Sequence, residues 1–277
     1  MKILVLGSSG QIGNHLCDYL QRKGHQPIEF DLVRSEKEDL RIENNQLLNE
    51  AIGKCDFVYF LAFDVGGSRY LKKYQHTFDF TQNNVRLMAN TFECLKKYNK
   101  PFIFASSQMS NMDHSPYGFQ KRLGEHYTKL LNGLVVKFWN VYGIEKDLDK
   151  SHVITDFILK AKDNSIIDMI TDGTEERQFL YAEDASEAMY ILMDCYKTVD
   201  RNKELHIANH KWNTILSVAS EIVKHFPAKI VPVENKDEVQ MGMKNEPNQY
   251  ILEFWQPKTT IEDGIKIMCN HYKNSVK

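Results

Sequence analysis

The sequence predicts an α/β fold in which a doubly wound parallel sheet carries helices on both faces. Short apolar runs alternate with segments whose apolar residues repeat at helical spacing, which is typical of β-α-β units around a buried parallel sheet. A glycine-rich turn joins the first run to the first helical segment, where such folds bind phosphates. The chain of 277 residues exceeds the usual size of one domain, so we expect a smaller unit beside the sheet.

The expected elements follow one another regularly as far as residue 143. We expect strands at 3–6, 28–30, 57–61, 102–104 and 134–138, and helices at 12–20, 47–52, 85–95 and from about residue 117. Beyond residue 143 the pattern is less regular, and we expect helices at 151–162, 184–196 and 260–272 with a strand at 205–207. Because no linker rich in proline or glycine separates this part of the chain, we expect its elements to be interleaved with the sheet.

Composition excludes several classes of partner. The net charge of −2 and the pI near 6.6 argue against a nucleic acid or an anionic membrane as partner. Five scattered cysteines without paired spacing indicate reduced thiols, and the apolar run at 3–6 is too short for a signal peptide or a membrane span. We therefore expect a cytoplasmic protein. Its histidines show no metal-ligand spacing, so we expect no metal.

The turn at residues 7–13 is the first candidate binding site. Its glycines permit a tight turn and let backbone N–H groups approach a pyrophosphate at the start of the following helix. The alternative is a purely structural turn, but the position between strand and helix favours a dinucleotide. We therefore expect the cofactor to contact Gly7, Ser9, Gly10, Gln11, Ile12 and Gly13.

Asp31 ends the second expected strand, 18 residues after Gly13. A carboxylate there accepts hydrogen bonds from the adenosine ribose and repels a 2′-phosphate, which favours NAD over NADP. Arg34 follows closely and could instead neutralise a phosphate. The remaining alternative is that Asp31 is only a turn residue.

Tyr117 and Lys121 are four residues apart at the start of an expected helix, so they share one of its faces. A neighbouring cation favours the phenolate, and the pair then supplies a general base near neutral pH. Such a spacing is common in surface pairs. Here it follows a strand and Ser107, whose hydroxyl is placed to hold a substrate oxygen beside the phenol, and we therefore expect all three residues to be catalytic.

Several further segments occur in a familiar order: Phe60-Leu61-Ala62, Ser115 to Lys121, Asn140-Val141-Tyr142-Gly143, Arg177-Gln178-Phe179 with Asp184, and Trp255 to Thr259. With these segments the chain resembles the extended short-chain dehydrogenases/reductases, a family of nucleotide-sugar epimerases, dehydratases and ketoreductases. The resemblance implies a Rossmann-type sheet with a smaller, interleaved C-terminal substrate domain. On this basis we assign 1–142 and 177–208 to an NAD-binding Rossmann domain, and 143–176 and 209–277 to a nucleotide-sugar-binding domain.

The resemblance also implies ligands and partners. It implies NAD as cofactor, a nucleotide-diphosphate sugar as substrate, and a homodimer formed through the helices near residues 88–95 and 117–131. Leu61 and Ala62 would contact the cofactor. The substrate would be contacted by Ser107, Gln108, Asn140, Arg177 and Lys244, of which Lys244 stands where relatives often place an arginine against the diphosphate.

Two segments, Asp64-Val65-Gly66-Gly67 and Ser151-His152-Val153-Ile154, resemble the branch that contains GDP-fucose synthase and GDP-mannose 3,5-epimerase. In the synthase the matching histidine works as an acid, so His152 is a fourth catalytic candidate; the alternative is a histidine that caps or packs a helix.

Two departures from the family limit the chemistry. Gln108 and Met109 stand where 4,6-dehydratases carry Asp-Glu, which disfavours dehydration. Met109 also replaces the cysteine base of the synthase, and because a thioether carries no proton, a two-base epimerisation is disfavoured.

We therefore expect an NAD-dependent nucleotide-sugar epimerase that works by transient oxidation and re-reduction of the sugar. The first alternative is an NAD(P)H-dependent 4-ketoreductase of a nucleotide-linked keto sugar. A second is a non-catalytic NAD sensor, which the presence of both Tyr117 and Lys121 disfavours.

Overall fold

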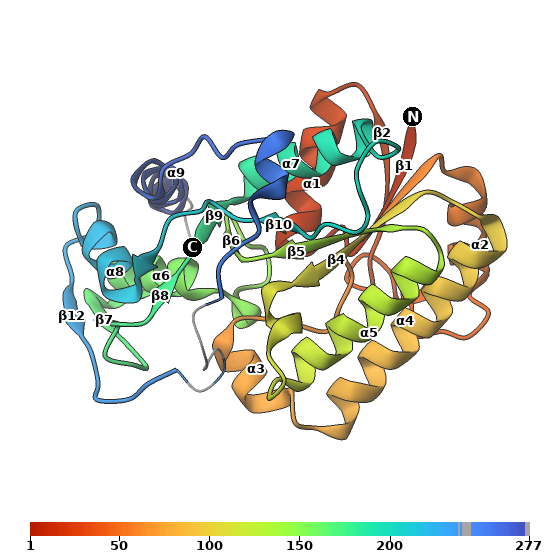
Figure 1. Cartoon of the computed structure of the whole chain (residues 1–277). Helices are drawn as coiled ribbons and strands as arrows, with labels where there is room; N and C mark the ends of the chain where they lie inside the picture. The colour runs from red at the N-terminus through yellow and green to blue at the C-terminus, as the bar shows by residue number, and fades with distance from the viewer. Residues whose placement is uncertain (238, 240–244, 275–277) are drawn as a thin grey trace.

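The computed structural model describes residues 1–237, 239 and 245–274, and its centre is a six-stranded parallel sheet (Figure 1). The strands lie in the order β10-β5-β4-β3-β1-β2. Their bounds are β1 (Lys2–Leu6), β2 (Gln26–Phe30), β3 (Phe57–Phe60), β4 (Phe102–Ser107), β5 (Leu134–Phe138) and β10 (Leu205–Ile207). The chain winds from β1 to β2 and then returns to β3 on the other side of β1. This confirms the doubly wound α/β fold, and such folds bind ligands at the carboxyl ends of the strands where the winding reverses.

Helices cover both faces of the sheet because alternate strand residues point to opposite sides. Ile3 and Val5 share a core with α1 and α7, whereas Leu4 and Leu6 share another with α2 and α4. The helices concerned are α1 (Gln11–Arg22), α2 (Gln46–Lys54), α4 (Phe78–Tyr98), α5 (Pro116–Leu130) and α7 (Ala182–Asp194). The central strands β1, β3 and β4 are thus buried on both faces, as their uninterrupted apolar runs predict, whereas the edge strand β2 is largely half-buried or exposed.

A second unit lies beside the carboxyl end of the sheet and has a core of its own (Figure 1). Ile158, Ala219 and Met268 are fully buried in it. Its helices are α6 (Val153–Asn164), α8 (Ile215–Val223) and α9 (Ile261–Asn274). Three short strand pairs complete it: β6 (Asn140–Tyr142) with β9 (Phe179–Tyr181), β7 (Ile166–Asp168) with β12 (Lys229–Val231), and β8 (Glu176–Arg177) with β11 (Asn213–Thr214).

The chain crosses between the two units more than once. The 3₁₀ helix η4 (Gln249–Glu253) and Trp255 pack into the core that α1 and α7 share with the sheet, although our domain boundaries assign them to the sugar-binding part. We therefore propose that the cofactor domain also takes in residues 249–255.

The remaining elements connect these layers. They are α3 (Ser68–Tyr74) and the 3₁₀ helices η1 (Glu36–Glu38), η2 (Gln108–Asn111) and η3 (Leu148–Lys150). The predicted helix starts at residues 151 and 184 fall within two residues of the observed starts of α6 and α7. Within the described residues, no helix combines the length and the apolar character that a membrane crossing requires.

Candidate active site

A cavity of about 600 Å³ opens at the carboxyl ends of the central strands and extends to the second unit. It brings together most of the candidate residues that the sequence predicts. These are Gly7, Ser9, Gly10, Gln11, Ile12, Gly13, Asp31, Leu61, Ala62, Ser107, Tyr117, Lys121, Asn140, His152 and Arg177. Residues from eight separate stretches of the chain therefore meet in one site.

The glycine loop fits a dinucleotide pyrophosphate. Gly7 has φ +86°, which favours glycine, and a Cβ on Gly13 would lie 2.0 Å from the Gly7 carbonyl oxygen. Gly10 precedes α1 and has no side chain to cap it, so the first backbone N–H groups of the helix are left to a ligand. Within the described residues, Gln11 Nε2 is buried in this wall and has no hydrogen-bond partner. An anion held at this turn would satisfy these donors.

Asp31 reaches back to the glycine loop from the end of β2. Its carboxylate oxygens accept hydrogen bonds from the backbone N–H groups of Ser9 and Val33, both at 2.9 Å. Arg34 turns to Glu29, with Nη1 and Oε2 2.6 Å apart, and its Nε lies 3.7 Å from Glu38. The cation that could have neutralised a 2′-phosphate is therefore already paired with carboxylates.

Tyr117 stands in the first turn of α5, close to the end of β4. The hydroxyl of Ser115 caps this helix by accepting from the Gly118 N–H at 3.0 Å. A Cβ on Gly118 would lie 2.0 Å from the Met109 carbonyl oxygen, so glycine lets α5 pack directly on η2. This close packing brings the phenol of Tyr117 near the hydroxyl of Ser107, and both side chains line the cavity.

Lys121 lies one turn further along α5 and is almost completely buried. Its Nζ donates a hydrogen bond to the Ala105 carbonyl at 2.7 Å. The same Nζ lies 3.7 Å from the centre of the Phe63 ring and 5.8 Å from the centre of the Tyr117 ring. Burial lowers the pKa of Lys121 to about 7, and the charge of Glu125 opposes this shift. The lysine thus contacts aromatic rings and a carbonyl rather than the phenol oxygen.

The pKa of Tyr117 moves in the direction opposite to the one that the sequence argument expects. Burial raises the pKa of the phenol, and the hydrogen bond with Ser107 only partly opposes that effect. Desolvation outweighs the Lys121 cation because that cation points to Ala105 instead. In the protein alone, Tyr117 is therefore a neutral phenol, and further positive charge must be nearby before it can act as a base.

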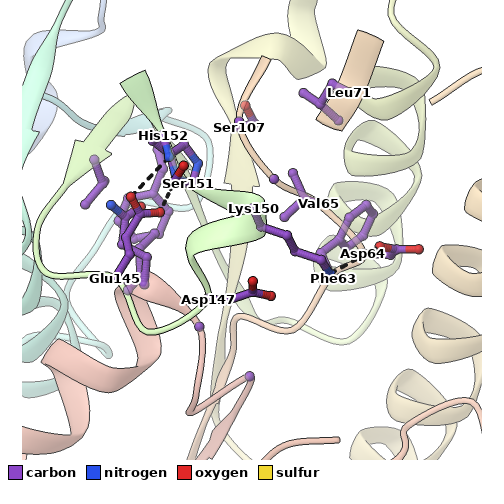
Figure 2. Close-up of a pocket in the computed structure, with 18 of the residues that line it drawn as sticks. Phe63, Asp64, Val65, Leu71, Ser107, Glu145, Asp147, Lys150, Ser151 and His152 are labelled. Atoms are coloured by element: carbon purple, nitrogen blue, oxygen red, sulfur yellow. Dashed lines mark hydrogen bonds and ion pairs between the residues drawn. The ribbon is translucent and has the colours of Figure 1, made fainter. Parts of the chain in front are cut away.

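The second unit supplies the opposite wall of the cavity. Figure 2 shows His152 and Glu145 side by side there, with the imidazole Nδ1 2.6 Å from a carboxylate oxygen. Arg177 also lines this wall and is paired with Asp237. An incoming diphosphate would therefore compete with a carboxylate for the Arg177 guanidinium.

Two of the predicted substrate residues are not among those that line the cavity, one because of its orientation and one because it is not described. Gln108 does not line the cavity, whereas its neighbour Met109 does. Both belong to η2, in which successive side chains point about 120° apart, so the two cannot face the same space. Lys244, the other prediction, lies outside the described residues.

Asp64 belongs to a segment that the sequence singled out, but its contacts were not predicted; it lines the cavity within a group of polar side chains (Figure 2). Asp64 accepts a hydrogen bond from the Tyr70 hydroxyl at 2.5 Å and another from Asn83 Nδ2 at 3.0 Å, and it lies 3.9 Å from Lys150 Nζ. These residues come from three separate segments, so no local spacing connects them. Glu145 was missed because no regular spacing connects it to its partner. It follows the recognised segment that ends at Gly143, but its partner is seven residues further along the chain.

The fold and cavity are those of a dinucleotide-binding protein. A comparison with family models makes this specific: residues 3–208 match the model of the NAD dependent epimerase/dehydratase family. The chain belongs to this family, which confirms the resemblance seen in the sequence.

Relatives over the full length act on different sugars. The chain is 25% identical to a putative UDP-glucose 4-epimerase of Methanocaldococcus jannaschii, over 99% of both chains. It is equally similar to a UDP-N-acetyl-alpha-D-glucosaminuronate decarboxylase of Bacillus cytotoxicus, over 99% of this chain and 93% of the relative. GDP-mannose 3,5-epimerase 1 of Oryza sativa subsp. indica is 24% identical, over 100% of this chain and 83% of the relative.

Solved structures agree on the fold. The UDP-glucose 4-epimerase of Thermotoga maritima, crystallised with UDP-glucose, superposes with a TM-score of 0.81 at 19% identity, covering 99% of both chains. At this identity the likeness establishes the fold alone.

Proposed function

We propose that this enzyme is an NAD-dependent nucleotide-sugar epimerase that oxidises a sugar hydroxyl transiently and then reduces the ketone from its other face. One observation carries the proposal: Ser107, Tyr117 and Lys121 share a cavity with the glycine loop. The cavity also reaches Arg177, a cation suited to a diphosphate. The substrate class follows from the family and from this second wall.

The residues divide the reaction between them. Ser107 and Tyr117 hold the oxygen of the reacting sugar hydroxyl, and Tyr117 takes its proton as the carbon loses a hydride. NAD bound at the glycine loop would supply the hydride acceptor and a positive charge beside the phenol. Lys121 supplies a second cation, which the raised pKa of Tyr117 makes necessary. On the return, Tyr117 gives the proton back, and hydride delivery to the opposite face of the ketone inverts the carbon.

The cofactor we propose is NAD rather than NADP. Asp31 already accepts two backbone hydrogen bonds and keeps its negative charge at the place of the adenosine ribose. Arg34 is engaged by Glu29 and Glu38, so a 2′-phosphate would meet carboxylates. Fluorescence titration with both cofactors tests this, and tighter binding of NADP would contradict it.

His152 supports a second candidate function, a 4-ketoreductase of a nucleotide-linked keto sugar. It lines the same cavity as Tyr117, and an imidazole is a common acid or base in catalysis. The stoichiometry of the cofactor separates the two functions. An epimerase needs only catalytic NAD, whereas a ketoreductase consumes one NADH or NADPH for each product.

The proposal is tested with UDP-glucose, UDP-N-acetylglucosamine, UDP-glucuronic acid and GDP-mannose, with and without NADH or NADPH, by chromatography and NMR of the products. We expect an epimer to form from one of them without net cofactor consumption. Tyr117→Phe should lower kcat by about 10²–10⁴-fold, the usual contribution of a positioned acid or base. Release of CO₂ from UDP-glucuronic acid would show instead that the enzyme is a decarboxylase. Full activity of Tyr117→Phe would refute the mechanism.

A further inference from the structure

His152 is held by both oxygens of a single carboxylate. Its ring Nδ1 lies 2.6 Å from Glu145 Oε1, and its backbone N–H donates to Glu145 Oε2 at 3.1 Å. Figure 2 shows the two side chains meeting at the wall of the cavity, and both line that cavity. The position and the ring orientation of His152 are thus fixed by the same group.

The two partners differ in their exposure. The side chain of Glu145 is 5% exposed, whereas that of His152 is 38% exposed. Burial acts to raise the pKa of Glu145, but the hydrogen bonds and charge of His152, with a hydrogen bond from Thr155, outweigh it, so this pKa lies below its usual value. Glu145 is therefore an ionised, acceptor-only group. The proton between the partners must belong to Nδ1, which leaves Nε2 as the ring nitrogen available to a ligand.

The arrangement differs from simple helix capping. His152 is the N-cap residue of α6, but its side chain makes no capping hydrogen bond. The loop that joins the partners is also attached to the opposite wall, since the Gly67 N–H donates to the Lys150 carbonyl at 3.3 Å and Lys150 Nζ lies 3.9 Å from Asp64. The loop between Glu145 and His152 is therefore attached to both walls of the cavity.

We propose that Glu145 is the positioning residue of a second proton-transfer site, in which it holds Nδ1–H of His152 so that Nε2 exchanges a proton with the sugar. The inference rests on the proposed function and extends it beyond Tyr117. The imidazolium gives its Nε2 proton to a substrate oxygen or carbanion and becomes a neutral imidazole that keeps Nδ1–H on Glu145. The reverse transfer restores it, so the protons balance without another reactant.

The first test is spectroscopic and needs no substrate. In full-length protein with ¹⁵N-labelled histidine, the ring nitrogens of His152 are assigned by their loss in His152→Gln. We expect a single Nδ1–H tautomer in the neutral form. In Glu145→Gln the amide can donate as well as accept, so the tautomers should mix. An unchanged His152 signature in Glu145→Gln would overturn the inference.

The second test is kinetic. With the nucleotide sugar that the wild type converts fastest in the panel above, Glu145→Gln should lower kcat by about tenfold or more, because a carboxylate orients the catalytic imidazole, and leave KM within about threefold. Glu145→Asp, which keeps the charge, should recover part of kcat. The matched control is Glu204→Gln, which alters another glutamate–histidine pair, in which Glu204 Oε2 lies 2.9 Å from His206 Nε2, outside the residues that line the cavity. This control should change neither kcat nor the ¹⁵N signals of the His152 ring nitrogens.

The outcomes separate this inference from the proposed function. If Tyr117→Phe abolishes turnover but Glu145→Gln keeps full kcat, the inference fails and the function stands. If no sugar is converted, the function fails, while the NMR measurement still decides whether Glu145 sets the tautomer. Melting temperatures of all variants exclude loss of folding as the cause of a lower kcat.

Discussion

Lys121 is an ammonium in a nearly dry site. It is 4% exposed, its Nζ donates to one carbonyl, and the nearest ring centre, that of Phe63, is 3.7 Å away. Cation–π contacts contribute about 0.5–2 kcal/mol, which only partly replaces the lost hydration. The pKa of about 7 therefore means that the charge of Lys121 changes within the physiological pH range.

We predict that Lys121→Met stabilises the fold at pH 7 and that this advantage shrinks as the pH rises. Lysine titrates near 10.5 in the unfolded chain and near 7 in the fold. Between these values the unfolded state binds more protons, so the wild type gains stability with rising pH, by at most about 1.4 kcal/mol per pH unit. Denaturant unfolding of both proteins from pH 7 to 9, without added cofactor, measures the difference.

The control is Lys129→Met, an exposed lysine on the same helix. Its free energy of unfolding should follow that of the wild type at every pH. A difference between Lys121→Met and the wild type that stays constant from pH 7 to 9 would contradict the assignment of a lowered pKa to Lys121.

The sequence predicts candidate site residues well where one strand end and one helix start carry them. Ser107, Tyr117 and Lys121 lie within 15 residues, so their placement follows from local structure. Phe63 could not be found in this way, because its role comes from contact with Lys121 in a distant segment. Glu145 could not be found because an irregular loop, not a regular helical or strand spacing, brings it to His152 seven residues further along. Gln108 was misplaced because a single 3₁₀ turn decides which of two neighbouring side chains faces the cavity.

The turn at residues 7–13 contains two glycines, Gly10 and Gly13, at which a side chain would have different amounts of space. A Cβ on Gly13 would collide with backbone, at 2.0 Å from the Gly7 oxygen and 2.9 Å from the Ser8 Cα, whereas a Cβ on Gly10 would meet that oxygen at an ordinary 3.4 Å. We predict that Gly10→Ala lowers Tm by less than about 4 °C but weakens NAD binding at least about tenfold, since its methyl group occupies the approach to the pyrophosphate.

Gly13→Ala should instead lower Tm several times more than Gly10→Ala does, because the backbone itself must move. Thermal unfolding and NAD titration of both variants give the comparison. Equal losses of stability, or undiminished NAD affinity in Gly10→Ala, would show that the loop does not hold the cofactor as described.

Elements that repeat a clear period were predicted, whereas most short ones were not; the three-residue strand β10 (Leu205–Ile207) is an exception that was predicted. The central strands and the long helices each offer several positions to count. The strands of the second unit have two or three residues, too few for a period to be detected. In α8, the residues Ile215, Val218, Ala219 and Ile222 do lie at helical spacing, but its β-branched residues are equally typical of a strand.

For the whole molecule, the sequence predicts the sheet but not the cavity. His152 and Arg177 reach it only because a second core places their segments opposite the strand ends, a long-range arrangement that no local pattern encodes. The cytoplasmic location stays a prediction. So does the homodimer, for which the structure offers a surface.

Helices α4 and α5 lie side by side along one outer edge of the molecule (Figure 1) and expose large apolar side chains there. Phe78 on α4 is 77% exposed, and Phe119 and Leu130 on α5 are 65% and 68% exposed. Large apolar side chains exposed on two neighbouring helices are typical of an interaction surface. We therefore predict that two copies of the chain pair through α4 and α5.

The prediction is checked by sedimentation velocity over a range of concentrations. The wild type should sediment at twice the chain mass of 32.3 kDa. Phe78→Glu combined with Leu130→Glu should weaken the dimer by about 100-fold or more, since burying unpaired charges costs several kcal/mol. Ile267→Glu, at a 44% exposed position on α9, is the matched control and should stay dimeric. If the wild type is monomeric at every concentration, or the control dissociates as readily as the double variant, then α4 and α5 do not form the interface.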